Sequence, residues 1–198
     1  MTTQKTQPQR RLFVSMLASL DGFIEGPQHE LDWFRDGDPQ FEQYCDEMID
    51  SVGLALYGRR SYQLMEQYWP NAEVNPKSAA DKAFAVKMNA LPKVVLSTTL
   101  REANWNNTQV FKDRVGERIA ALKREPGKPI VAWAGAGLVA TLTELNLVDE
   151  YRVLVQPVVL GAGTPLFRGI TGRRDLRLVR TSQLGSSIAV LCYEPISK

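Results

Sequence analysis

The sequence of 198 residues predicts one α/β domain with a central, mostly parallel mixed sheet, an antiparallel C-terminal edge and helices on both faces. Three observations predict it. Strand-like and helix-like segments alternate through the first three quarters of the chain. From Glu150 onward the segments are rich in β-forming residues and are joined by Gly- and Pro-containing connections. No repeat or linker interrupts this order, so we expect residues 11–198 to form one domain after a flexible tail at residues 1–10.

The expected strands of the first three quarters are short apolar runs. They cover residues 11–18, 52–57, 93–97 and 130–134. The antiparallel edge is expected from three later runs at residues 151–160, 176–182 and 188–193.

Helices are expected where apolar residues recur at a spacing of three or four. The first has Asp38 as its cap, Pro39 in its first turn, and Phe41, Tyr44, Cys45, Met48 and Ile49 on its inner face. A second begins at Arg59, a third covers residues 78–89, a fourth carries Phe111, Val115, Ile119 and Leu122 on one face, and a fifth buries Leu138, Leu142 and Leu145.

Composition excludes several classes of protein. With 44% hydrophobic and 23% charged residues the chain belongs to the globular class. Its net charge of +2, without a basic block, argues against a nucleic-acid partner. Four arginines, Arg173, Arg174, Arg177 and Arg180, are expected on a solvated strand face. A polar N-terminus and no membrane-spanning run predict a cytoplasmic location and no membrane partner.

Metal and nucleophile chemistry is also constrained. The chain has a single histidine, His29. Zinc sites that need histidine, and Ser-His or Cys-His catalytic systems, are therefore excluded unless His29 is the histidine that they use, and we expect no metal. The two cysteines, Cys45 and Cys192, are expected to be buried thiols rather than a disulfide.

A glycine turn is the first candidate site. Gly135, Gly137 and Ala140 match G-x-G-x-x-A directly after a strand and at the start of a helix. Helix N-terminal amides attract anions, and glycine lets a phosphate approach the backbone. Too little chain follows for a Rossmann domain, so we expect an anion-binding helix start.

Two further strand ends carry polar groups. At Gly58-Arg59-Arg60-Ser61, guanidinium groups suited to phosphate stand where a strand meets a helix, although two arginines on a surface helix would look the same. Ser97-Thr98-Thr99 adds hydroxyl groups at another strand end.

The loop after the first strand carries carboxylates beside an aromatic ring. Its members are Asp21, Glu25, Glu30, Asp32 and Trp33. Such a set could orient and protonate a nitrogen heterocycle, but Asp-Gly is also a common turn dipeptide, and both interpretations remain open.

Together these segments resemble the dihydrofolate-reductase-like superfamily, and most closely the reductase domain of bacterial riboflavin biosynthesis and its stand-alone relatives. The matching motifs are SLDGFIEGP…ELDWF at 19–34, LYGRRSY at 56–62, KVVLSTTL at 93–100, VAWAGAGLVATLTELNLVDEY at 131–151 and PVVLGAGTPLF at 157–167. They occur in family order across nearly the whole chain. The resemblance implies the three-layer fold of that superfamily.

The resemblance also implies a function. It implies a reductase that uses NADPH to reduce a small nitrogen heterocycle or a 5-amino-6-(5-phosphoribosylamino)uracil-like compound. A protein that binds a nucleotide or another ligand without turnover, on the same scaffold, is the alternative. Relatives commonly pair, so a homodimer is expected, to which Val190 or Phe167 could contribute unless they pack in the core.

Site residues follow from the same resemblance. Arg59 would contact the adenosine 2′-phosphate, Ser61 the pyrophosphate, Ser97 and Thr98 the adenosine ribose and its phosphate, and Ala18 the nicotinamide. Gly58, Arg60, Ala134, Gly135, Ala136, Gly137 and Leu138 complete the expected cofactor site. Asp21 and Trp33 would approach the substrate, with Asp21 as the proton donor.

Two departures from the family pattern stand out. Ala134 replaces the first glycine of a Gly-Gly pair whose peptide bond is typically cis in relatives, and we expect the Ala134–Gly135 bond to be cis. The helix that holds a substrate-binding carboxylate in dihydrofolate reductases offers Glu42, Asp46 and Glu47 here, none on its expected inner face.

Overall fold

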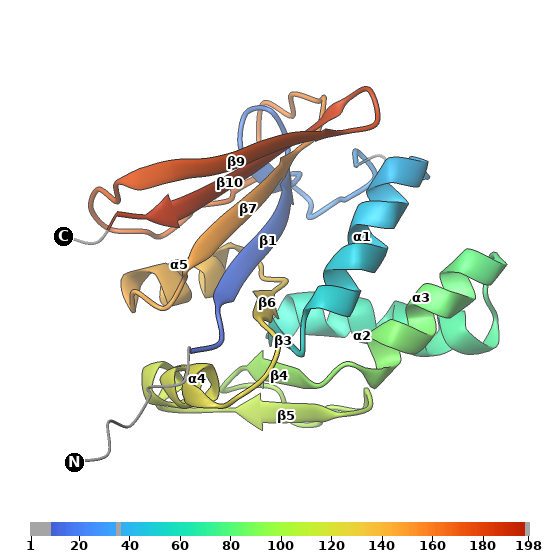
Figure 1. The fold of residues 1–198 in the computed structure, drawn as a ribbon, viewed down its shortest axis with the longest axis horizontal. Helices are drawn as coiled ribbons and strands as arrows, with labels where there is room; N and C mark the ends of the chain where they lie inside the picture. Colours follow the sequence, from blue (N-terminus) through green and yellow to red (C-terminus); the bar gives the residue numbers. More distant parts are fainter. Residues whose placement is uncertain (1–8, 35–36, 197–198) are drawn as a thin grey trace, which may run out of the picture.

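The computed structural model describes residues 9–34 and 37–196, and Figure 1 shows a twisted sheet with helices on both sides. Most of the expected tail, residues 1–8, lies outside the described residues. Arg10, at the end of that expected tail, is buried, and its Nε donates a hydrogen bond of 2.7 Å to the Lys128 carbonyl.

Eight of the described strands form one sheet in the order β5-β4-β3-β6-β1-β7-β10-β9. Their bounds are β1 Leu12–Ala18, β3 Leu54–Gly58, β4 Lys93–Leu96, β5 Thr108–Phe111, β6 Ile130–Ala132, β7 Glu150–Val155, β9 Leu176–Leu184 and β10 Ile188–Pro195. From β5 to β7 all neighbours are parallel, whereas β10 is antiparallel to both β7 and β9. The predicted mixed sheet with an antiparallel C-terminal edge is therefore confirmed.

Helices cover both faces, as predicted. The side chains of Phe13, Tyr57 and Val95 pack with α1 (Pro39–Ser51), α2 (Arg59–Val74) and α3 (Ala79–Ala90). Their sequence neighbours Val14, Leu56 and Val94 point to the other face, toward α4 (Val115–Arg124) and α5 (Ala136–Glu144). Alternate residues of one strand therefore fill two different cores, which is why the strands are apolar throughout rather than alternating.

The two cysteines are not joined by a disulfide, as expected, but only one of them is fully buried. Both are free, with Cys192 buried in β10 and Cys45 partly buried on α1. Burial raises the pKa of the Cys45 thiol to about 12, so this sulfur is not a thiolate near neutral pH.

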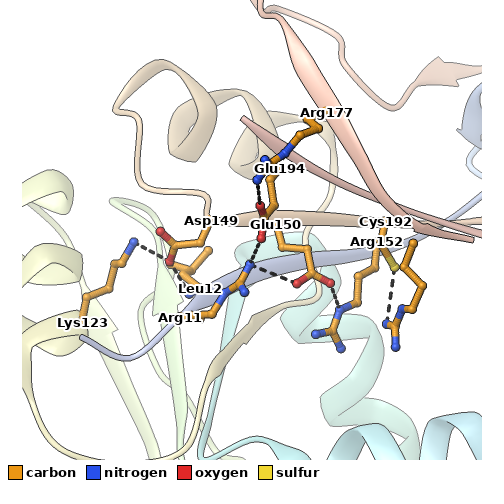
Figure 2. A network of polar contacts seen from close by, with 10 residues as sticks. Arg11, Leu12, Lys123, Asp149, Glu150, Arg152, Arg177, Cys192 and Glu194 are labelled. Atoms are coloured by element: carbon orange, nitrogen blue, oxygen red, sulfur yellow. Dashed lines mark hydrogen bonds and ion pairs between the residues drawn. The ribbon is translucent and has the colours of Figure 1, made fainter. Parts of the chain in front are cut away.

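Ion pairs gather at the amino-terminal ends of β1 and β7, the end of the sheet away from the candidate site. Figure 2 shows Asp149 accepting a hydrogen bond from the Leu12 amide and pairing with Lys123. Arg11 joins Glu150 to Glu194, and Glu194 also pairs with Arg177. Of the four arginines predicted on a solvated strand face, Arg177 and Arg180 lie on β9, with Arg177 in this network, whereas the other two precede that strand.

Several local predictions were wrong. Phe111 ends strand β5 instead of opening a helix, and α4 begins at Val115. Leu145 follows α5 and is half exposed rather than buried. The short pair of β2 (Phe23–Glu25) with β8 (Thr164–Pro165) was not expected, because pairing between segments so far apart leaves no local pattern.

The predicted start of α1 is confirmed and can be tested. The Asp38 carboxylate accepts hydrogen bonds from the amides of Gln40 at 2.8 Å and Phe41 at 3.3 Å, and Pro39 is the first helical residue. We expect Asp38→Ala to lower the free energy of unfolding by about 1 kcal/mol in urea denaturation, because these amides lose their acceptor. Asp38→Asn keeps an acceptor and is the control; equal losses in both variants would contradict the capping role.

Candidate functional site

A groove of about 370 Å³ opens at the carboxyl ends of β3, β4 and β5, between the starts of α2, α4 and α5. Its walls are formed by Gly58, Arg59, residues 96–99, Phe111, Lys112, Val115, Gly137, Leu138 and Thr141. This is the edge of a parallel sheet where ligands collect. The lining combines an apolar floor with hydroxyl groups and two basic side chains, and it includes no acidic residue.

Parallel pairing explains how distant segments meet there. β3 pairs with β6 so that Leu56 lies opposite Ala132, and β3 pairs with β4 so that Gly58 lies opposite Leu96. The turns that follow these three strands therefore leave the sheet at one edge, although they lie far apart in the sequence.

Two helices begin at this edge without a side-chain cap. Gly58 caps α2 and Gly135 caps α5, and neither cap residue can offer a side-chain acceptor to the first amides. A Cβ atom placed on Gly58 would lie 3.7 Å from the Leu138 Cβ, and one on Gly135 would lie 3.6 Å from the Ser61 Oγ. The two helix starts thus lie against each other and present their positive ends together.

The groove includes part of the predicted cofactor site. The predicted residues that line it are Gly58, Arg59, Ser97, Thr98, Gly137 and Leu138. Ser61 lies beside Gly135, at the contact between the two helix starts. Ser97 also organises its own turn, since its Oγ accepts hydrogen bonds from the amides of Thr99 at 3.1 Å and Leu100 at 2.9 Å.

Other predicted cofactor residues do not line the groove. Ala18, Ala134 and Ala136 are buried, and Arg60 is exposed on the first turn of α2. Although burial opposes it, the pKa of Glu25 is lowered by hydrogen bonds from Thr164 and His29 and by the nearby charges of His29 and Arg60. Arg60 therefore lies near enough to Glu25 for its charge to act on that carboxyl group.

The Ala134–Gly135 peptide bond is trans, as are all peptide bonds of the described residues, so the predicted cis bond is wrong. Gly135 has an ordinary extended conformation, with φ −72° and ψ 167°, from which α5 begins. A cis bond between non-proline residues would cost roughly 3 kcal/mol, and this helix start forms without one.

Asp21 connects the loop after β1 to the loop after β7 through hydrogen bonds. Its carboxylate accepts hydrogen bonds from the Ser19 hydroxyl at 2.7 Å, the Gly161 amide at 2.8 Å and the Leu160 amide at 3.1 Å. The Ser19 hydrogen bond, helped by the two amides, lowers the pKa of Asp21 despite an opposing effect of desolvation. Asp21 is consequently ionised near neutral pH and poorly suited to donate a proton.

Trp33, the second predicted substrate residue, lies in the loop that follows β2. Its indole Nε1 donates a hydrogen bond of 3.1 Å to the Glu30 carbonyl, and the side chain is half-buried. Neither Asp21 nor Trp33 lines the groove.

Sequence analysis missed two polar side chains near these segments. Lys112 lines the groove, but the sequence pattern places its neighbour Phe111 on a helix, so the position of Lys112 at a strand end is not predicted. Gln156 follows β7 and is fully buried, and neither atom of its carboxamide has a hydrogen-bond partner among the described residues. Its backbone amide donates to the Ala18 carbonyl at 2.8 Å. The signal in the sequence that could have found Gln156 is its polar side chain between Val155 and Pro157 in an otherwise apolar run.

Two features are absent from the described part of the chain. No group of three or more His, Cys, Asp or Glu side chains there could hold a metal ion. None of the helices described is both long and apolar enough to cross a membrane.

Comparison with known proteins gives the family. The model of the RibD C-terminal domain family matches residues 10–190. YyaP, an uncharacterized protein of Bacillus subtilis (strain 168), is 37% identical over 186 residues, which cover 93% of this chain and 95% of YyaP.

Solved structures give the fold. A pyrimidine reductase-like protein from Corynebacterium diphtheriae superimposes with a TM-score of 0.62 at 13% identity, over 96% of this chain and 93% of that one. Dihydrofolate reductase from Enterococcus faecalis, complexed with NADP(H) and RAB-propyl, gives 0.59 at 13% identity, over 96% and 98% of the two chains. The chain therefore has the fold of these reductases, as the resemblance implied.

The buried Gln156 carboxamide leads to a stability prediction. An unpaired buried polar group costs about 1–3 kcal/mol, so we expect Gln156→Met, which keeps length and flexibility, to raise the free energy of unfolding by about 1 kcal/mol or more. Urea denaturation measures the change. Gln183→Met, at an exposed position of β9, is the control. A destabilised Gln156→Met would show that the amide makes favourable hydrogen bonds in the folded state.

Proposed function

The chain belongs to the RibD C-terminal domain family, and we propose that it is an NADPH-dependent reductase. The observation that carries the proposal is the groove, in which Arg59 stands beside two uncapped helix starts and no acidic side chain contributes to the lining. The Arg59 guanidinium has no hydrogen bond or ion pair with any other described residue, so it is available to an anion.

The chemistry of the groove fits a phosphorylated dinucleotide. Arg59 would hold the adenosine 2′-phosphate, and Ser97 and Thr98 would hold the adenosine ribose and its phosphate. The start of α5, with Ser61 beside it, would hold the pyrophosphate. A Cβ atom on Gly137 would meet nothing within 4 Å, so this helix start is open to a ligand. Ala18, at the end of β1, would adjoin the nicotinamide.

NADPH, when bound, supplies the hydride. The residues of this chain bind and orient the two reactants and exclude water, and this positioning lowers the barrier. The substrate we propose is a small nitrogen heterocycle or a 5-amino-6-(5-phosphoribosylamino)uracil-like compound. We assign Asp21 a positioning role, because an ionised carboxylate that already accepts three hydrogen bonds is a poor acid.

A ligand-binding protein without turnover is the alternative. Its support is the substrate side of α1, where Asp46 pairs with Lys87 at 2.7 Å and Glu47 accepts a hydrogen bond from Gln43 at 2.8 Å. Both carboxylates therefore have partners at the protein surface. NADPH binding without hydride transfer to any pyrimidine, pterin or flavin-precursor substrate would favour this alternative.

Removal of the Arg59 guanidinium tests the cofactor site. We expect Arg59→Ala to weaken NADPH binding by roughly ten- to a hundredfold in titration calorimetry, because a charge-assisted hydrogen bond contributes about 1.5–3 kcal/mol. Arg124→Ala, an exposed arginine at the far end of α4, is the matched control and should bind NADPH like the wild type. If neither NADPH nor NADH binds the wild type, the reductase proposal fails.

The role of Asp21 is tested by its titration. We expect NMR to place its carboxyl pKa below the usual value of 3.8, and Ser19→Ala to move it upward, since the Ser19 hydroxyl contributes most to the lowering. Because the pKa is lowered, the hydrogen bonds from the amides of residues 160 and 161 to the ionised carboxylate are fully formed at pH values above the usual pKa of an aspartate. They are lost only as the pH falls through the lowered pKa. A measured pKa near neutrality would restore Asp21 as the proton donor.

A further inference from the structure

A polar cluster lies on the α1 side of the strands β7, β10 and β9, and none of its members lines the groove. Arg152 of β7 and Arg180 of β9 both lie opposite Cys192 of β10 in the register of the sheet. Residues that lie opposite one another point to the same face, so these side chains form a row across three strands. Tyr44 of α1 packs against the apolar cluster that includes Cys192.

The Tyr44 hydroxyl is buried and has no hydrogen-bond partner among the described residues. Burial raises the pKa of this phenol, and the charges of Arg152 and Arg180 are close enough to oppose that increase. The hydroxyl therefore stays protonated near neutral pH and can donate a hydrogen bond. Because a buried hydroxyl without a partner costs free energy, an anion that accepts its hydrogen bond would remove that cost.

The Arg180 guanidinium has no carboxylate partner in the described ranges. Its Nη2 lies 3.5 Å from the Cys192 sulfur, which is its one hydrogen-bond partner there, and a thiol is a weak acceptor. Most of the N–H donors of Arg180 are therefore available to a ligand.

Arg152 is oriented by its neighbours but retains free donors. Its Nε donates a hydrogen bond of 2.6 Å to Glu150, and its guanidinium carbon lies 3.7 Å from the centroid of the Phe13 ring. The two Nη nitrogens have no partner among the described residues. Glu150 also pairs with Arg11, so its one negative charge is shared between two arginines.

The cluster can be reached from solvent along β9. This strand is the last of the sheet, and no other strand in the described part of the chain pairs with its outer edge. Arg180 is exposed, and so is Ser182, which points to the same face two residues further along the strand. Arg152 and Tyr44 lie further in and are half-buried.

Two guanidinium groups and one phenol hydroxyl from three separate elements thus offer N–H and O–H donors to one place. A phosphate group carries nearly two negative charges near neutral pH and has three oxygens that accept hydrogen bonds, and arginine binds it through paired N–H groups. A carboxylate has one charge and would use fewer of these donors.

We propose that Arg152, Arg180 and Tyr44 form an anion site that binds the phosphate group of a small molecule, either free phosphate or a phosphate ester. This site is separate from the groove, since β1 lies between the outer strands and the strands that end at the groove. It does not depend on the proposed function.

Titration calorimetry with inorganic phosphate and with ribose 5-phosphate tests the site. All proteins carry Arg59→Ala, so that the groove contributes little. We expect the added substitution Tyr44→Phe to weaken phosphate binding by about tenfold and Arg180→Gln, at an exposed position, by about three- to tenfold. Arg173→Gln, an exposed arginine that precedes β9, is the matched control and should bind like the parent.

Urea denaturation without phosphate separates binding from a structural role. Because its hydroxyl has no partner, we expect Tyr44→Phe to be at least as stable as the parent. A less stable Tyr44→Phe would contradict the role of this hydroxyl as a ligand donor.

The two probes distinguish the sources of the phosphate group. Binding of ribose 5-phosphate would assign the site to a phosphate ester, and binding of inorganic phosphate alone would assign it to the free ion. The proposal is refuted if the parent binds neither probe, if Tyr44→Phe and Arg180→Gln bind both as well as the parent, or if Arg173→Gln loses as much affinity as they do.

Discussion

Parallel pairing of β3 with β4 and with β6 is the constraint on which the site depends. Because three parallel neighbours end at one edge, the turns after Gly58, Leu96 and Ala132 must leave the sheet together. Two of those turns start helices, and neither start has a side-chain cap. The positive ends of α2 and α5 are therefore placed side by side by the sheet itself. The groove needs no special loop conformation to exist.

Charge is divided between the two ends of the strands. At the amino-terminal end of β1 and β7, Arg11, Glu150 and Glu194 neutralise one another within a network of ion pairs. In the groove the basic side chains have no acidic partner in the lining. Arg11 and Arg177 are exposed, although Glu150 is buried, so these pairs contribute modestly to stability. The charges at one end of the strands are thus paired, whereas the groove at the other end has two basic side chains and no acidic residue in its lining, which favours an anionic ligand.

How far the sequence could predict the structure depended on how local the information was. The start of α1 was predictable, because a cap residue, a proline and an apolar period are all within one stretch. The place of Arg59 and Gly137 in the groove lining was predictable, because each lies in a short motif between a strand and a helix. Strand β5 was not, since Phe111 and Val115 are also spaced as on a helix, and only pairing with β4 decides the conformation. The position of Lys112 in the groove was not predicted for the same reason.

The loops after β1 and β7 are held by a different kind of interaction from the groove. After β1 and β7 the chain is joined by backbone hydrogen bonds, from Gln156 to Ala18 and from Leu20 to Val158, and by the Asp21 carboxylate. These ties depend on main-chain groups and one acid, so most side chains of residues 157–163 can change without breaking them. The groove depends instead on the side chains of its two cations. If the groove holds the cofactor and these loops approach the substrate, as proposed, the substrate can change while the cofactor site stays the same, because the two sites are held by separate interactions.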